Sequence, residues 1–189
     1  MRFYGNDSNS IMLGVFSEFG LLIYFLLTKL FGSVDWYSIG CKTSEVKKWF
    51  IALYSLFGII FLNLFSYIFA YFGGLQRQFN AHLINFISLQ YHSTQIIYLI
   101  WLIVLIPSIE ELFFRGVFFT YLKETSGLKI ALLLQAILFA IVHDYNPYAF
   151  SLHFMSGLLY GYLFYKCNSL YPCIFMHSLN NFFNLLISI

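Results

Sequence analysis

Three groups of ionisable and polar residues interrupt long apolar runs in the second half of the chain. They are Glu110 and Glu111 with Arg115, Phe139 with His143, and His177 with Asn181. A charge at the centre of a bilayer costs at least about 2.5 kcal/mol, so such residues are candidates for function. Carboxylates and imidazoles are the side chains that most often transfer protons in hydrolysis. The three groups therefore predict acid–base chemistry in an apolar environment.

The two adjacent carboxylates are predicted to face in different directions. Glu111 and Arg115 are four residues apart, so they share one face of a helix and can form an ion pair. Glu110 is turned by about 100° from Glu111 around the helix axis, which leaves it free to face a cavity. The alternative is a charge cluster that only braces a kinked helix, and three charges would be a costly brace in lipid.

The two histidines are ambiguous when each is considered alone. His143 ends an apolar run, where a histidine is usually an interfacial residue or already bonded. His177 and Asn181 lie one turn apart on one helix face, where they either reach a cavity or bond to a neighbouring helix. Considered together with Glu110, the set permits hydrolysis, because Glu110 and His143 can take a proton from a water molecule. His177 and Asn181 can then donate hydrogen bonds to the oxyanion that forms at a carbonyl.

The same side chains are plausible ligands for a divalent metal ion. Glu110, His143 and His177 would form that ligand set, since carboxylates and imidazoles both coordinate zinc. The chain has no HExxH sequence, which would place two histidines and a base on one helix. We therefore expect no required cofactor, with a divalent metal such as zinc as the alternative.

The composition indicates an all-α integral membrane protein. Of the 189 residues, 60% are hydrophobic and 10% are charged, and the mean hydropathy is +0.77. An average soluble domain carries about 25% charged residues, and the basic residues are too scattered for a nucleic-acid surface. Backbone groups in lipid must bond within their own segment, which favours helices. We expect one transmembrane domain, 1–189, with spans at 11–31, 49–72, 96–122 (broken at Pro107), 128–143, 148–165 and 170–189.

Lysines give the expected orientation of these six spans. Seven of them fall on loops of one side, namely Lys29, Lys42, Lys47, Lys48, Lys123, Lys129 and Lys166. Positive loop residues stay in the cytoplasm, so both termini are predicted to be extracytoplasmic. Within the fifth span, Gly157 and Gly161 form a GxxxG pattern that predicts close helix packing, with His153 packed beside it. The segment 73–93 is expected to hold a short interfacial helix.

The motifs in this order resemble a known family. EExxxR, FxxxH and HxxxN on successive hydrophobic helices are similar to those of the CAAX-protease and bacteriocin-processing (CPBP or Abi) intramembrane endopeptidases. The stretch from Cys167 to His177 also resembles the family's segment that leads into the last histidine. The resemblance covers about residues 107–182, which we take as the catalytic core.

This resemblance implies a helical bundle with a polar cavity inside the membrane. Glu110 and His143 would activate water, His177 and Asn181 would stabilise the oxyanion, and Glu111, Arg115 and Phe139 would support the site. The substrate would be a membrane-associated peptide or protein with an embedded or lipidated end, and lipids would be the other partner. Family members are described both as metalloproteases and as glutamate-type peptidases, and we favour the second because one free carboxylate with neutral ligands is a weak metal site.

Two features differ from the type II CAAX prenyl endopeptidases. The chain has fewer expected spans, and its N-terminal half carries no motif of the family. Bacterial peptide maturation, or self-immunity to a bacteriocin, therefore fits better than prenyl-protein processing. Two other functions use the same residues: a proton-coupled transporter and a non-catalytic immunity protein that sequesters a toxin. A transporter would predict internal repeats, and the first two spans show none.

Overall fold

The computed structural model describes residues 35–72, 99–143 and 146–187, together with residues 20, 28–29, 32 and 97. Nearly all of the predicted span 11–31 and the whole predicted interfacial segment 73–93 lie outside the described residues. Every regular element in the described part is helical. The elements are α2 (Lys48–Phe72), the π-helix η1 (Trp101–Leu105), α5 (Ile106–Glu111), the π-helix η2 (Leu112–Phe119), α6 (Thr120–Ser126), α7 (Leu128–His143), α8 (Pro147–Cys167) and α9 (Leu170–Ile187).

The boundaries of α7, α8 and α9 follow from local sequence signals. Gly127 has a positive φ of 84°, which ends the preceding helix and lets α7 begin at Leu128. The Asn146 side chain accepts a hydrogen bond from the Tyr148 amide at 2.9 Å and so caps the start of α8. Asn168 adopts the left-handed conformation (φ 46°) at the end of α8. These boundaries agree with the predicted spans 128–143, 148–165 and 170–189.

Residues 101–126 form one uninterrupted helical run, so the break predicted at Pro107 is wrong. Proline lacks the N–H that would continue an α-helical ladder. The chain instead enters Pro107 from a π-helical turn, in which the Ile106 N–H donates to the Trp101 carbonyl five residues back. The helix changes register near the proline and continues through it.

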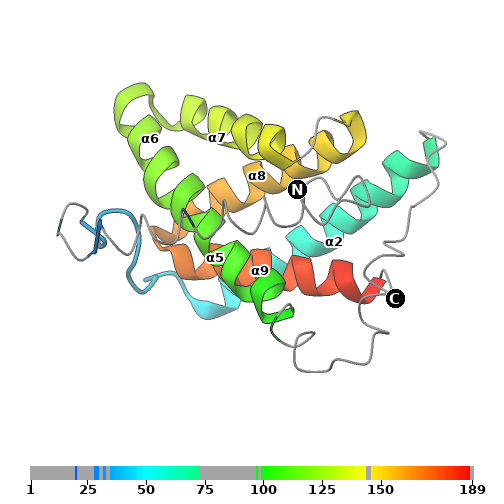
Figure 1. Cartoon of the computed structure of the whole chain (residues 1–189), viewed down its shortest axis with the longest axis horizontal. Coiled ribbons are helices and arrows are strands. Elements are labelled where there is room, and N and C mark those ends of the chain that lie inside the picture. Colours follow the sequence, from blue (N-terminus) through cyan, green and yellow to red (C-terminus); the bar gives the residue numbers. More distant parts are fainter. Residues whose placement is uncertain are drawn as a thin grey trace.

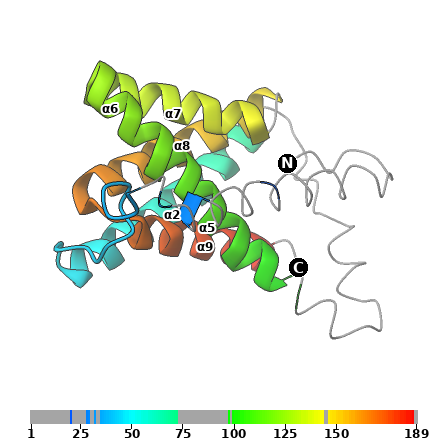
Figure 2. The same ribbon diagram turned by 60° about the vertical axis from the view of Figure 1, so that its left-hand side comes forward.

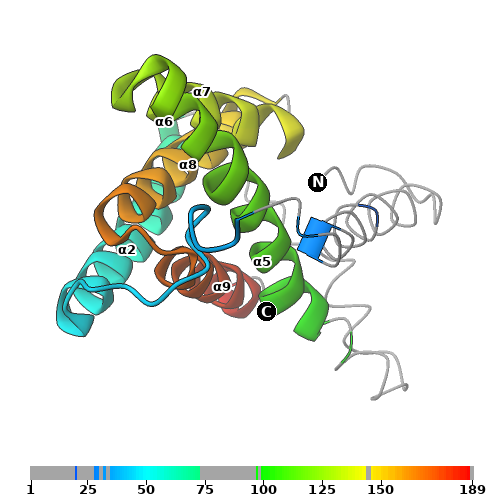
Figure 3. The ribbon, with the colours of Figure 1, turned by 90° about the vertical axis from the view of Figure 1, so that its left-hand side faces the viewer.

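α8 lies at the centre of the described bundle. It packs against α7 along one side and against α2 and α9 on others, and Figure 2 shows α7 lying along it. The run 101–126 crosses the bundle, with η1 and α5 against α9 and with η2 and α6 against α7 (Figure 3). This arrangement brings α5, α7 and α9, which carry the three motifs, around one interior region.

Close packing between α7 and α8 depends on the predicted GxxxG face. A Cβ atom placed on Gly157 would lie 2.8 Å from the Cα of Ala136, which is a backbone clash. A Cβ on Gly161 would lie 2.6 Å from Nε2 of Gln135, the end of a side chain. The close-packing role predicted for these two glycines is therefore confirmed.

We predict that Gly157→Ala destabilises the protein by about 1–3 kcal/mol, because the two helices must move apart to admit the methyl group. Gly161→Ala is the matched variant, and its smaller expected loss reflects a side chain that can rotate away. Thermal unfolding of the two purified variants measures the difference. Equal stability of Gly157→Ala and the wild type would contradict the packing argument.

One helix in the described part has the length and composition needed to cross a membrane. It comprises the 22 residues Lys48–Phe69 of α2, and α7 is apolar but shorter. Large apolar side chains of α2 are more than half exposed, among them Leu53, Phe57, Ile60 and Tyr67. Such a face requires an apolar surrounding, which lipid supplies. Six spans remain a prediction.

Candidate active site

Glu111 and Arg115 form a buried ion pair across α5 and η2. Nη1 of Arg115 lies 2.8 Å from Oε1 of Glu111, and both side chains have 0% exposure. The four-residue spacing predicted this contact. Because an isolated buried charge is costly, the pair neutralises two charges that the bundle interior would otherwise disfavour.

Aromatic rings and a backbone carbonyl hold the Arg115 guanidinium in place. Its Cζ lies 4.6 Å from the centroid of the Phe139 ring and 5.3 Å from that of Tyr160. Nη2 donates to the Gly157 carbonyl at 3.4 Å, and Nε2 of Gln135 donates to the same oxygen at 2.8 Å. Cation–π contacts strengthen when water is excluded. The ring of Phe139, which was predicted to support the site, lies against the Arg115 guanidinium.

His177 bonds to the carboxylate that was predicted only to brace the helix. Its Nδ1 lies 2.9 Å from Oε1 of Glu111, the same oxygen that Arg115 contacts. An ionised carboxylate only accepts hydrogen bonds, so Nδ1 of His177 is the donor. The Tyr160 ring stacks on the imidazole at a centroid distance of 4.9 Å. Glu111 therefore orients the guanidinium and the imidazole together.

Glu110 faces both imidazoles. Its Oε1 lies 3.6 Å from Nε2 of His143, and its Oε2 lies 3.7 Å from Nε2 of His177. These distances exceed a direct hydrogen bond and suit a shared small molecule such as water. The Glu110 side chain keeps 13% exposure, whereas that of Glu111 has none. As expected from the sequence, Glu111 is paired with Arg115, whereas Glu110 faces in another direction.

His143 presents a nitrogen lone pair to Glu110 when it is neutral. Its Nδ1 contacts the Phe139 carbonyl at 2.6 Å, and a carbonyl can only accept, so Nδ1 carries the proton. Nε2, which faces Glu110, is then an acceptor. The His153 ring stacks on His143 at 4.4 Å and bonds to the Ala149 carbonyl at 2.7 Å. His153 thus restricts the orientation of the His143 imidazole.

Asn181 is tied to the helix that carries Glu110. Its Nδ2 donates to the Leu102 carbonyl at 3.1 Å. In a regular α-helix, the Leu102 carbonyl would accept a hydrogen bond from the Ile106 N–H, but that N–H donates to the Trp101 carbonyl instead. In a π-helix, the Leu102 carbonyl would accept from the N–H of residue 107, but this residue is Pro107, which has no N–H. Asn181 supplies the donor that the proline removes, and this links α9 to η1.

We predict that the cost of Asn181→Ala depends on Pro107. In the wild type, loss of this bond should cost about 1 kcal/mol, within the range for hydrogen bonds between membrane helices. In a Pro107→Ala background the cost should shrink, because residue 107 then offers its own N–H. Unfolding free energies of the four proteins form the double-mutant cycle. An unchanged cost would mean that Asn181 does not serve this carbonyl.

Three side chains of the site were missed or undervalued by the sequence analysis. Tyr160 and Gln135 stood inside apolar runs and offered no motif, and His153 was expected only to pack. Each contacts the predicted residues across a helix interface. The one available signal was their position opposite or within the GxxxG segment, which brings α7 and α8 close together.

The alternative metal ligands meet around Glu110 but do not form a metal site as placed. In the described part of the chain, no group of three or more His, Cys, Asp and Glu side chains is positioned to hold a metal ion. The side chains gathered here are two carboxylates, two imidazoles, one guanidinium and one amide.

The helical bundle thus buries a group of ionisable and polar side chains. This is the arrangement of a membrane protein with a polar site in its interior. The family model described as type II CAAX prenyl endopeptidase Rce1-like matches residues 92–183, a range that contains all three motifs. The second half of the chain is therefore similar to a family of membrane-embedded endopeptidases, and the match agrees with the resemblance to CPBP proteins. No curated protein and no solved structure matches the chain.

Proposed function

We propose that this protein is an intramembrane endopeptidase in which Glu110 and His143 activate a water molecule. The observation that carries the proposal is the placement of the Glu110 carboxylate between Nε2 of His143 and Nε2 of His177, at 3.6 and 3.7 Å. The neighbouring Glu111 forms an ion pair with Arg115. One carboxylate is thus structural, and the other is available for proton transfer.

A water between Glu110 and His143 can donate a hydrogen bond to each of them. Both Oε1 of Glu110 and the unprotonated Nε2 of His143 are acceptors, so either one can take the proton as general base. The water oxygen then bonds to the carbonyl carbon of the peptide. When the carbon–nitrogen bond breaks, the same proton passes to the departing amine, and the base returns to its starting state.

His177 and Asn181 are the proposed donors to the oxyanion. Because Nδ1 of His177 donates to Glu111, its Nε2 can donate only in the imidazolium form. Asn181 uses one amide hydrogen on Leu102 and retains a second. Preorganised donors of this kind stabilise charge that develops in the transition state.

The proposed substrate is a peptide or protein with a membrane-embedded or lipidated end. The exposed apolar face of α2 supports a membrane location, and the family supports a multi-pass topology. Lysines on the segment 35–48, near the α6–α7 junction and near the α8–α9 connection support six spans with extracytoplasmic termini. The proposed location is a bacterial cell membrane. Peptide maturation or self-immunity to a bacteriocin is the proposed role.

The deciding experiment is cleavage of a membrane-presented peptide by the full chain in proteoliposomes. We expect activity in the wild type, its loss in His143→Ala, and no effect of a strong chelator on the wild type. Loss of activity on chelation, with recovery on adding zinc, would replace the glutamate mechanism by the metal-dependent one. A proton flux without cleavage would favour a transporter, and toxin protection that survives His143→Ala would favour an immunity protein.

A further inference from the structure

A second polar cavity lies at the lysine-rich end of the bundle and has no part in the proposed hydrolysis. Its volume is about 180 Å³, and it is enclosed by the segment 35–42, the end of α6 and the end of α8. At about 30 Å³ per water molecule, this space equals roughly six waters, enough for one hydrated phosphate group. Buried rings of Phe119 and Phe164, 5.6 Å apart, form its apolar floor.

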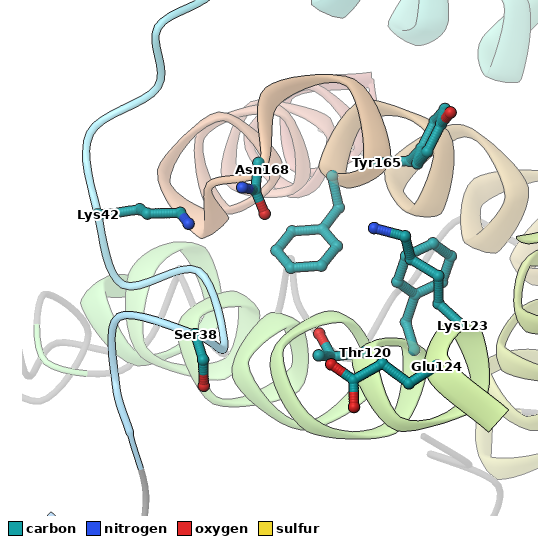
Figure 4. A pocket seen from close by; sticks show the side chains of 9 residues that line it. Ser38, Lys42, Thr120, Lys123, Glu124, Tyr165 and Asn168 are labelled. Carbon is teal, nitrogen blue, oxygen red and sulfur yellow. The ribbon is translucent and has the colours of Figure 1, made fainter.

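Two ammonium groups converge on this cavity from different elements. Lys42 comes from the segment before α2 and Lys123 from α6, and Figure 4 shows them pointing toward each other with Asn168 between them. Among the described residues, no carboxylate lies within 4.0 Å of either lysine nitrogen. Glu124 is the single acidic side chain of the lining, so the lining keeps one net positive charge.

The segment that carries Lys42 is anchored next to the cavity. The Leu170 N–H donates to the Gly40 carbonyl at 2.9 Å, and the Ser169 hydroxyl donates to the Lys42 carbonyl. A Cβ on Gly40 would lie 2.6 Å from the Phe164 ring, so this close approach needs glycine. Lys123 is held on the other side by its helix. The fold therefore sets the backbone positions of both lysines beside the cavity, and the Lys123 side chain is solvent-exposed.

We propose that this cavity, named here the lysine pocket, binds a phosphate-bearing anion. Ammonium groups are strong donors to phosphate oxygens, and the Asn168 amide adds a neutral donor. The pocket is too small for a whole lipid, so a lipid would place only its headgroup there. Basic pockets between helices at the cytoplasmic surface suit anionic headgroups. The proposal is independent of whether Glu110 hydrolyses peptides.

The test uses the purified full chain in a neutral detergent at constant ionic strength. Thermal unfolding is followed while phosphatidic acid, phosphatidylcholine or inorganic phosphate is titrated. A ligand that binds only the folded state raises the unfolding temperature with its concentration. We expect stabilisation by phosphatidic acid, by inorganic phosphate or by both, and none by phosphatidylcholine. Phosphatidic acid alone would identify a lipid headgroup as the source, and inorganic phosphate would identify a soluble anion.

Matched charge variants make the result specific to the pocket. Lys42→Gln with Lys123→Gln should weaken the apparent affinity at least tenfold, and Lys42→Arg with Lys123→Arg should retain most of it. The double variant Lys47→Gln with Lys129→Gln removes the same charge from exposed positions outside the lining. The apparent affinity of this variant for the anion should change less than twofold. Absence of stabilisation in the wild type, or equal losses in the two glutamine pairs, would overturn the proposal.

Discussion

Glu110→Gln should reduce peptide cleavage by about 10²–10⁴-fold, the usual contribution of a general base. The substitution keeps the size of the side chain and its contacts with His143 and His177, but it removes the charge and the proton acceptor. Single-turnover cleavage in proteoliposomes measures the chemical step directly. The apparent affinity for the peptide should change little, because the variant alters proton transfer rather than binding.

One control variant and one stability measurement separate chemistry from folding. Glu45→Gln removes an exposed carboxylate before α2, outside the lysine pocket, and should leave cleavage unchanged. Unfolding of Glu110→Gln should also match the wild type within about 1 kcal/mol, since Oε2 of Glu110 has no hydrogen-bond partner and the glutamine keeps the side chain that faces His143. Full activity in Glu110→Gln would remove the proposed function.

Arg115→Met should be the most destabilising single change at the site, by about 3–5 kcal/mol. It leaves the fully buried carboxylate of Glu111 without its cation, and His177 then remains as the partner of that oxygen. The chain should lose activity together with stability. Thermal unfolding in detergent measures the first effect, and cleavage by the fraction that remains folded measures the second.

A pair of companion variants identifies the cause of that loss. Arg115→Met combined with Glu111→Leu removes both charges and should recover a large part of the stability, because no uncompensated charge remains. Its activity should stay low, since His177 has lost the acceptor that orients it. If the double variant is no more stable than Arg115→Met, lost packing around the guanidinium outweighs electrostatics.

The sequence predicted those features that depend on local spacing. α7 runs from Leu128 to His143 as expected, because glycine before it and a polar turn after it mark both ends. The Glu111–Arg115 pair follows from helical geometry alone. The family resemblance followed from the order of three short motifs and is matched over residues 92–183.

Features that depend on contacts between helices were not predictable in this way. Hydrophobic periodicity gives no sign of a π-helical turn, so Pro107 was expected to break a helix that continues through it. The Asn181 contact with Leu102 exists only because that turn frees a carbonyl. The bond from His177 to Glu111 rather than to Glu110 is set by the packing of α9 on α5. These contacts depend on how the helices pack against one another, which residue spacing does not specify.

The position of α9 in the chain has a consequence for biosynthesis. The ribosome completes the run 101–126 before it makes residues 170–187, so the early helix exists for a time without His177 and Asn181. Its guanidinium and one carboxylate already neutralise each other within the helix, but Glu110 and the Leu102 carbonyl have no late partner yet. A nascent chain stalled before α9 therefore leaves these polar groups without the partners that α9 supplies. Such a chain is a natural target for the proteases that remove unfinished membrane proteins.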